Sequence, residues 1–418
     1  MNRLRQFWHA AKRVFDLPRR LREVRDHRAD PRVPTFAVNA TLFLGALLRK
    51  PSFLQLQFES ARRGWQRLIA HSARITDDRM VYVCERYRLE DWRSVLVSTS
   101  QVLKRNKAFE AAKIHGLLVV ALDGNEQFKS RCRCCPECSQ RQIKSKNRLG
   151  QIEEVTEYYH RFVCAQLHGP ELSVVLDLEP IRPGEDEAAA ALRLLGRMRR
   201  LYGPRFFDAV TVDAWYATGP FIQAVQRLGW GVIAVLKQER YEIYQEATAL
   251  MAQTPVIPWK WEDRQIELRE VKDLPFTDPA IGTMRVVQAH EYWSERRQHG
   301  GQKTTVRQQS FWRWLVSREL EGIPAQGIWR LGHARWGIEN HVFNELTQHY
   351  HLEHCPHHHP VAIVAWLLIL MLAFNLFEWF ARLHGKLLRA GAITLAELTQ
   401  QLDRALERHE ELEPLWSG

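Results

Sequence analysis

The strongest constraint on how this chain can fold is a series of strand-like and helix-like segments between residues 116 and 237. Apolar stretches rich in Val and Leu lie at 116–128, 161–168 and 171–181, and each has the pattern of a buried strand. An amphipathic helical stretch follows at 185–202, then a strand at 207–218, a helix at 220–228 and a strand at 230–237. Strands that alternate with helices in this way predict an α/β sheet with helices packed against it.

The order of these segments is that of an RNase H-like fold: three strands, helix, strand, helix, strand. Residues 239–327 instead alternate polar and apolar residues, which predicts a β-rich insertion. The fold class is therefore predicted to be α/β, with an RNase H-like mixed sheet interrupted by that insertion. The predicted regions are a basic helical N-terminal region (1–112), the first part of the RNase H-like domain (113–238), the insertion (239–327), the second part with a core helix (328–382) and a helical C-terminal tail (383–418).

Positive charge is concentrated at the N-terminus. The chain has 59 Lys and Arg against 48 Asp and Glu, and residues 1–50 hold 12 of the basic but only 4 of the acidic residues. Because Lys and Arg on phosphates supply sequence-independent affinity, residues 1–112 are predicted to bind DNA. A basic face that is merely solvated is the alternative. The odd number of cysteines, seven, fits a reducing cytosol rather than a disulfide framework.

One apolar run, residues 361–380, approaches the length that spans a bilayer. It contains Asn375 and Glu378 and directly follows a polar segment. A helix that is apolar all round can also form the centre of a large soluble core. We therefore predict a buried core helix and no membrane association, with a membrane anchor as the weaker alternative.

Three acidic residues lie where this topology would bring them together. Asp123 is at the end of the first strand, Asp213 is at the end of the fourth, and Glu339 lies early in a helix after the sheet. Adjacent strands place the first two close together, and a helix packed on the sheet can add the third. Such a carboxylate cluster suits two Mg²⁺ (or Mn²⁺) ions that activate an attacking oxygen and stabilise a leaving oxygen in phosphoryl transfer.

The motifs around these acids resemble those of bacterial insertion-sequence transposases of the DDE class. LDG at Asp123, TVDAWY at Asp213 and above all RWGIENHVFNEL (335–346) carry the resemblance, which extends from Pro34 to Phe380. It is closest to the branch with a β-rich insertion in its RNase H-like domain. The resemblance implies that Asp123, Asp213 and Glu339 are catalytic metal ligands and that Arg335 contacts transposon-end DNA.

The implied function is a DNA transposase that binds terminal inverted repeats and catalyses metal-dependent strand cleavage and strand transfer. Its partner would be double-stranded DNA, both transposon ends and target, bound by a homodimer in the bacterial cytoplasm. Where related transposases carry Tyr and Lys, this sequence has Gly332 and Leu346. An RNase H-like nuclease, or a catalytically lapsed or domesticated DNA-binding derivative, is therefore kept as an alternative.

Further residues are predicted to contact DNA. Asn340 shares the face of Glu339, and Trp293 is a candidate for stacking on a flipped base, although most tryptophans of the insertion are expected to fill its core. Phosphate contacts are expected from Lys237, Arg296 and Arg297.

A cysteine cluster predicts a second, structural metal site. Cys132, Cys135 and Cys138 repeat the spacing of a zinc knuckle, and His160 begins the next strand, where it could complete a tetrahedral zinc site. Reduced cysteines in a surface hairpin are the alternative. The histidine-rich segment 349–359 matches no single tetrahedral set, and we predict a polar loop beside DNA there.

Overall fold

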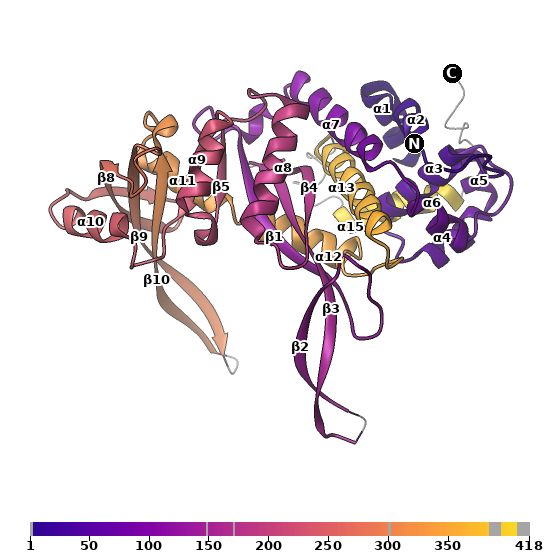
Figure 1. Ribbon diagram of the computed structural model, residues 1–418. Helices are drawn as coiled ribbons and strands as arrows, with labels where there is room; N and C mark the ends of the chain where they lie inside the picture. The colour runs from indigo at the N-terminus through magenta and orange to yellow at the C-terminus, as the bar shows by residue number, and fades with distance from the viewer. Residues whose placement is uncertain (1–2, 148, 170–171, 300–301, 384–393, 408–418) are drawn as a thin grey trace.

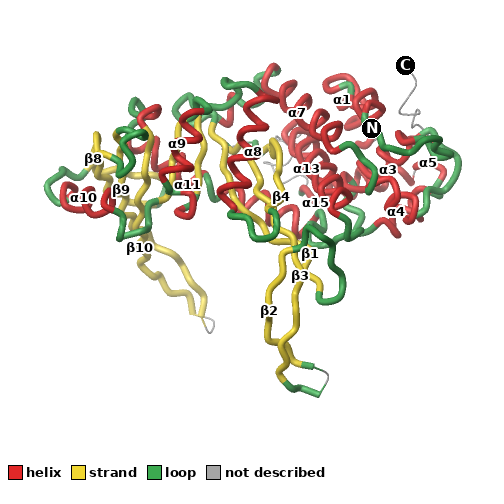
Figure 2. Tube along the Cα trace, in the orientation of Figure 1, coloured by secondary structure: helices red, strands yellow, loops and turns green. Residues whose placement is uncertain are grey.

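A ten-stranded mixed sheet runs through the molecule, with helices on both sides of its central part (Figures 1 and 2). The computed structural model describes residues 3–147, 149–169, 172–299, 302–383 and 394–407. The strand order is β2-β3-β1-β5-β6-β10-β9-β8-β7, and β4 also pairs with β3. The strands are β1 (Val119–Ser130), β2 (Ser139–Lys146), β3 (Ile152–His168), β4 (Val174–Ile181), β5 (Ala209–Val212), β6 (Gly231–Val235), β7 (Ile257–Trp261), β8 (Arg264–Pro275), β9 (Thr283–His299) and β10 (Gln302–Ser317).

The part of the sheet built from β4, β3, β1, β5 and β6 has the RNase H-like arrangement. β1 pairs antiparallel with β3 and parallel with β5, β3 pairs antiparallel with β4, and β5 pairs parallel with β6. Helix α8 (Glu187–Tyr202) connects β4 to β5, and helix α9 (Gly219–Arg227) connects β5 to β6. The predicted α/β fold class is confirmed.

A long hairpin, β2–β3, lies where the sequence indicated only a loop between two strands. Strand β3 begins nine residues before the predicted 161–168 segment, and β2 pairs with this extension from Ser139↔Tyr159 to Lys146↔Ile152. Most side chains in the extension are exposed or half-buried, so the hairpin has no apolar face. Periodicity signals a strand only when one face is buried, and this is why the hairpin was missed.

Strands β7 to β10 continue the sheet beyond β6 through an antiparallel pairing of β10 with β6. A second hydrophobic core, which includes Trp314 and Trp329, lies under this extension. The region also contains helix α10 (Glu242–Met251), which the strand-like pattern of 239–327 did not predict. Figure 1 shows the β9–β10 and β2–β3 hairpins projecting from the same side of the body.

A helical body packs against the opposite end of the sheet. Its N-terminal elements are α1 (Arg3–Phe15), α2 (Leu17–Glu23), α3 (Thr35–Leu47), α4 (Phe53–Ser60), α5 (Arg63–Ile69), α6 (Asp77–Cys84), α7 (Leu89–Arg105) and the short helix η1 (Glu110–Ala112). Its C-terminal elements are η4 (Ile338–Phe343), α12 (Asn344–His349), α13 (Pro360–Leu383) and α15 (Leu395–Glu407), whereas η3 (Arg318–Leu320) and α11 (Ala325–Ala334) pack on the sheet extension. Of the predicted tail, 384–393 and 408–418 lie outside the described residues.

Helix α13, the apolar run of the sequence, forms the centre of this body. Phe7 and Phe15 of α1 pack edge-on against Phe380 and Trp379 of α13, with ring centroids 5.2 and 4.6 Å apart. Within the described residues, α13 alone is long and apolar enough to cross a membrane, but 89% of its most apolar window is buried. This burial agrees with the predicted core helix.

The two polar residues of α13 have specific partners. The Asn375 side chain donates to the Val175 carbonyl (2.7 Å) and accepts from the Val175 amide (2.8 Å), so α13 covers the free edge of β4. Glu378 lies 3.5 Å from Nε2 of His341 in η4, and its hydrogen bond raises the pKa of that imidazole. Asn375 therefore attaches α13 to the sheet, and Glu378 attaches it to η4.

Replacing Asn375 with Leu is expected to lower the free energy of unfolding by about 1–3 kcal/mol, because both backbone groups of Val175 lose their side-chain partner in a buried setting. Urea denaturation followed by circular dichroism measures this loss. Asn344→Leu is the matched control, since Asn344 is exposed and its amide contacts only the Asn340 carbonyl. An equal loss in both variants would contradict the structural role of Asn375.

Candidate active site

The register of the sheet places Asp123 and Asp213 side by side. Strand β1 pairs in parallel with β5, and the last pair is Ala121↔Thr211. Each aspartate lies two residues beyond that pair on its own segment, and neighbouring strands are about 4.8 Å apart. Asp213 caps the short helix η2 (Ala214–Tyr216), and its Oδ1 accepts from the Trp215 amide at 2.8 Å.

The third carboxylate reaches the same place from η4. Arg335 connects it to β1, because its Nη1 donates to Oδ2 of Asp123 and to Oε1 of Glu339, each at 3.1 Å. Glu339 lies one helical turn after Arg335, and its side chain is half exposed, whereas those of Arg335 and Asp123 are mostly buried. The structure therefore brings together all three predicted carboxylates.

Negative charge in this cluster is only partly compensated. Burial raises the pKa of Asp123 to about 7, the Arg335 charge opposes this shift, and the neighbouring Glu339 and Asp213 carboxylates add to it. Arg335 supplies one positive charge to three carboxylates. Hard oxygen ligands that converge in this way fit divalent cations such as Mg²⁺ or Mn²⁺.

The N-terminus of α8 supports the aspartates, and sequence reasoning did not predict this support. Tyr216 donates to Glu187 at 2.6 Å, and the Trp215 indole donates to Asp186 at 3.1 Å. The Glu187 carboxylate lies so close to Gly124 that a Cβ there would come within 2.2 Å of it. Glycine after Asp123 therefore makes room for a fourth acidic side chain at the site.

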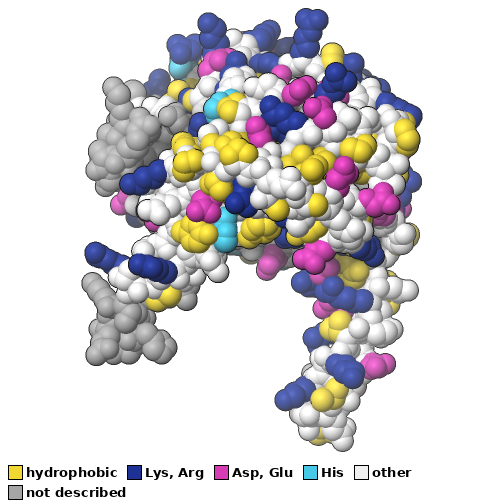
Figure 3. Space-filling model, turned by 90° about the vertical axis from the view of Figure 1, so that its left-hand side faces the viewer, with side chains coloured by type: hydrophobic (Ala, Val, Ile, Leu, Met, Phe, Trp, Pro, Cys, Tyr) yellow, Lys and Arg dark blue, Asp and Glu magenta, His cyan; other side chains and the backbone are white. Residues whose placement is uncertain are grey.

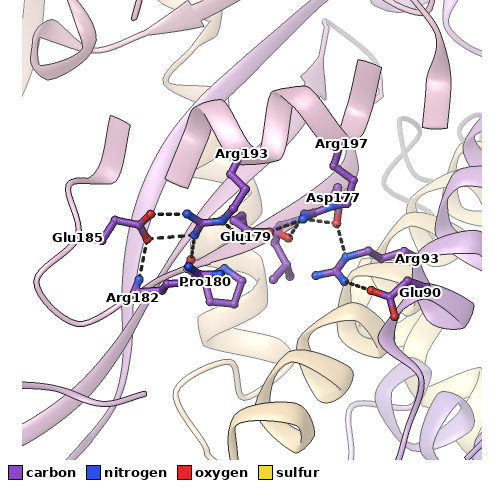
Figure 4. Close-up of polar contacts among 10 residues, drawn as sticks. Glu90, Arg93, Asp177, Glu179, Pro180, Arg182, Glu185, Arg193 and Arg197 are labelled. Carbon is purple, nitrogen blue, oxygen red and sulfur yellow. Dashed lines mark hydrogen bonds and ion pairs between the residues drawn. The ribbon is translucent and has the colours of Figure 1, made fainter. Parts of the chain in front are cut away.

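An ionic network fixes α8 on the sheet behind the site (Figure 4). Arg197 of α8 donates to the buried Asp177 of β4 at 2.7 Å and also pairs with Glu179. Arg193 joins Glu179 to Glu185, and Arg93 of α7 approaches Asp177 at 3.5 Å. The network connects β4, α7 and α8, and so sets the position of the α8 N-terminus.

The two departures from the family motif have packing explanations. A Cβ at Gly332 would come within 2.3 Å of the Trp314 indole, so the indole occupies the space of a side chain there. Leu346 is fully buried in the main core. Neither position could present a Tyr or Lys to DNA in this fold. Arg335, whose predicted role is DNA contact, here lies inside the carboxylate cluster.

Of the other residues predicted to contact DNA, Asn340 lies in η4, Arg296 and Arg297 lie in β9, and Lys237 follows β6. Asn340 and Arg296 are exposed, while the side chain of Arg297 lies outside the described residues. Lys237 is exposed and lies 5.9 Å from the ring centre of Trp312, which packs edge-on against Trp336 beside Arg335.

Two tryptophans offer different surfaces for stacking. Trp293 is half-buried, with the Arg264 guanidinium 4.2 Å from its ring centre. Trp215 is 63% exposed and lies two residues from Asp213, so it presents an open aromatic ring beside the site that sequence reasoning missed.

Basic residues line the two projecting hairpins, called here the β2–β3 arm and the β9–β10 arm. Figure 3 shows Lys and Arg along both arms. On β2, Lys144 and Lys146 are exposed, whereas Arg141 is held by Glu126 and Glu157. Arg296 belongs to the β9–β10 arm. Lys144 and Lys146 lie on β2, which pairs with β3, and β3 pairs in turn with β1, the strand that carries Asp123.

Three of the four predicted zinc ligands come together, and the fourth does not. Cys135, Cys138 and His160 converge with His358, and their ligand atoms all lie within 4.8 Å of one another. Cys132 is exposed and contacts Ser130 instead. His358 belongs to the histidine-rich segment that we expected to be a polar loop without a metal role. The contact of His358 with Cys138 could not be predicted from spacing, because the two residues are 220 positions apart in the sequence.

A comparison with protein families agrees with the motifs. Residues 176–376 match the family described as "Transposase DDE domain", a range that includes Asp213, Arg335 and Glu339 but begins after Asp123. No curated protein matches the chain. A solved structure, the piggyBac transposase synaptic complex with hairpin DNA, is similar at 9% identity and a TM-score of 0.42, over 97% of this chain and 78% of that one. Residues 176–376 thus match a transposase DDE domain, which confirms the family resemblance for that part of the sequence.

Proposed function

We propose that this protein is a DNA transposase that binds the terminal inverted repeats of its element, cleaves DNA strands and joins the freed ends to a target. The observation that carries the proposal is the convergence of Asp123, Asp213 and Glu339 on an RNase H-like sheet, joined through Arg335. The match to the transposase DDE domain supports the same chemistry. The proposed setting is a homodimer that synapses two DNA ends in the bacterial cytoplasm, at the nucleoid.

The chain's own residues suggest how the reaction would be organised. Asp123 and Asp213 would hold one divalent ion between neighbouring strands, and Glu339 would complete the site for a second. Two such ions, when bound, activate the attacking oxygen and stabilise the leaving oxygen. In cleavage, a water oxygen bonds to phosphorus and the bond to the 3′-oxygen breaks, leaving a 3′-hydroxyl. In strand transfer, that 3′-hydroxyl attacks a target phosphodiester and displaces another 3′-oxygen.

Arg335 would change partners when DNA and cations arrive. Its guanidinium now neutralises Asp123 and Glu339, and divalent cations would take over that role. The released guanidinium would then be free for a phosphate, as the family resemblance implies. Lys237, Arg296, Arg297 and Asn340 are proposed as further contacts, with Trp293 and Trp215 as surfaces on which a base could stack.

The proposal is tested with linear DNA that carries the sequences flanking this gene. Purified protein with Mg²⁺ or Mn²⁺ is expected to nick or cut at the ends of inverted repeats, and to join pre-cut ends to plasmid DNA. EDTA should stop both reactions. Cutting without joining of pre-cut ends would favour an RNase H-like nuclease. Repeat binding without any cutting would favour a catalytically lapsed or domesticated DNA-binding protein, which the altered positions Gly332 and Leu346 motivate.

Neutralising the β2–β3 arm is expected to weaken DNA binding in all sequence contexts. Lys144→Ala with Lys146→Ala removes two exposed cations and should lower the slope of log affinity against log salt by about 2, because roughly one counterion is released per phosphate contact. Fluorescence anisotropy at several salt concentrations measures the slope. Arg199→Ala with Arg200→Ala is the matched control, since these residues lie in the last turn of α8, about 20 Å from its site-facing end. Equal slopes for the two double variants would contradict a DNA-binding role of the arm.

A further inference from the structure

Four side chains from distant parts of the chain converge at the base of the β2–β3 arm. Cys135 and Cys138 come from the turn between β1 and β2, His160 comes from β3, and His358 precedes α13 by two residues. Cys138 and His358 are 220 residues apart in sequence. The cluster is separate from the carboxylate site, and nothing in the proposed transposition chemistry uses it.

Four of the five distances known within the cluster are close to those of a tetrahedral metal site, and the fifth, Cys138–His358, is shorter. A zinc ion with sulfur ligands at about 2.3 Å and nitrogen ligands at about 2.05 Å requires roughly 3.8 Å between two sulfurs, 3.5 Å between sulfur and nitrogen and 3.3 Å between two nitrogens. The two Sγ atoms are 3.8 Å apart, and the two Nε2 atoms are 3.3 Å apart. The Sγ–Nε2 distances are 3.4 Å for Cys135–His160, 3.3 Å for Cys138–His160 and 2.9 Å for Cys138–His358.

The local backbone also suits a thiolate. The Cys135 amide donates to Sγ of Cys138 at 3.3 Å, and the Cys138 amide donates to the Cys135 carbonyl at 3.1 Å, which closes a tight turn. Backbone N–H donors stabilise a negatively charged acceptor. Both cysteines are free and half-buried. Two soft sulfurs and two imidazoles in a tetrahedron favour zinc over the hard cations that suit carboxylates.

We infer that Cys135, Cys138, His160 and His358 form a structural zinc site. Four protein ligands close the coordination sphere, as in structural rather than catalytic zinc sites. The ion would join three segments: the turn after β1, the strand β3 that pairs with Asp123, and the entry to α13. Glu339 and α13 are already linked through His341 and Glu378, so zinc would fix the base of the arm to the elements that carry both Asp123 and Glu339.

Metal content of the full-length protein, purified without a polyhistidine tag, tests the site. Plasma mass spectrometry is expected to find about one zinc per chain. Cys138→Ser and His358→Ala should each lose most of it. The matched controls Cys132→Ser and His354→Ala, which change a neighbouring cysteine and a histidine of the same segment, should retain it. Absence of zinc from the unmodified protein, or equal zinc in Cys138→Ser, would overturn the assignment.

Cobalt substitution identifies the ligands independently of variant folding. The unmodified protein, stripped by a chelator and refilled with Co²⁺, should show the intense visible bands of a tetrahedral ion and a near-ultraviolet sulfur-to-cobalt band. Weak octahedral bands without the sulfur band would place the metal on the histidine-rich segment alone and overturn the assignment.

Removal of zinc should also lower the thermal stability of the protein and the protection of the β2–β3 arm from hydrogen exchange. The thermal midpoint is expected to fall by about 5 °C or more, because a ligand that binds only the folded state stabilises it. Hydrogen exchange should rise in residues 131–160. These readouts do not depend on DNA cleavage, so a failure of the zinc site and a failure of the transposase proposal can be told apart.

Discussion

Alanine at any of the three clustered carboxylates is expected to lower Mg²⁺-dependent DNA strand cleavage by more than about a hundredfold, because each removes a ligand from the ions that stabilise the leaving oxygen. The variants are Asp123→Ala, Asp213→Ala and Glu339→Ala. DNA affinity should stay unchanged or rise slightly, since phosphate contacts come from basic residues and each variant removes a negative charge. Gel assays of end cleavage and of repeat binding on the same preparations separate the two effects.

Glu353→Ala is the control for these variants, because Glu353 is an exposed carboxylate outside the cluster. Cleavage at the unmodified rate in Glu339→Ala would remove Glu339 from the proposed mechanism. Glu187 would then be the next carboxylate to test, since it lies against Gly124 and accepts from Tyr216. Glu345 is less suitable, because Arg49 holds its carboxylate at 2.8 Å.

Replacing Asp177 with Ala is expected to lower the free energy of unfolding by about 3–5 kcal/mol, the effect of leaving buried charges without a partner. The Asp177 side chain is 1% exposed and neutralises Arg197 and Arg93, whose side chains are also largely buried. Urea denaturation measures the loss. Because Asp177 fixes α8, whose first turn supports the loop after Asp213, cleavage should fall as well at temperatures near the melting midpoint.

Two further variants show whether unpaired charge causes the loss. Asp177→Leu combined with Arg197→Met removes both partners and should recover much of the stability, since an apolar pair of similar volume can replace a buried ion pair. Glu23→Ala breaks an ion pair whose side chains are both 56% exposed, and should change stability little. A loss for Asp177→Ala as small as that for Glu23→Ala would contradict the role of the network.

Much of the fold could be predicted from local patterns. The strands around Asp123 and Asp213 are buried and apolar, α8 has an amphipathic stripe, and α13 is apolar all round, so each has a periodicity that can be read from the sequence. The β2–β3 hairpin could not be predicted in this way, because its two strands project away from the body and bury no face. The domain boundaries derived from these patterns stay predictions.

The convergence of the carboxylates could also be predicted from local patterns. Asp213 directly follows the buried strand β5, and Asp123 lies where the parallel pairing of β1 with β5 stops, although β1 itself continues to Ser130, so the strand end predicted at Asp123 was wrong. A parallel pair of strands brings such positions together regardless of what lies between them. Arg335 and Glu339 are one helical turn apart, so their proximity is local. The support from Glu187 could not be predicted, because it depends on how α8 lies over Gly124.

The sequence by itself determined the elements with a buried apolar face or a fully apolar sequence, the transposase DDE domain that residues 176–376 match, and the two aspartates that the pairing of β1 with β5 aligns. Only the tertiary structure decided which residues meet across long separations. It placed His358 beside Cys138, Asn375 on the free edge of β4, and the Trp314 indole in the space beside Gly332. Local periodicity records whether a side chain is buried, whereas the identity of its partner depends on the packing of elements far apart in sequence, 200 residues in the case of Asn375 and Val175.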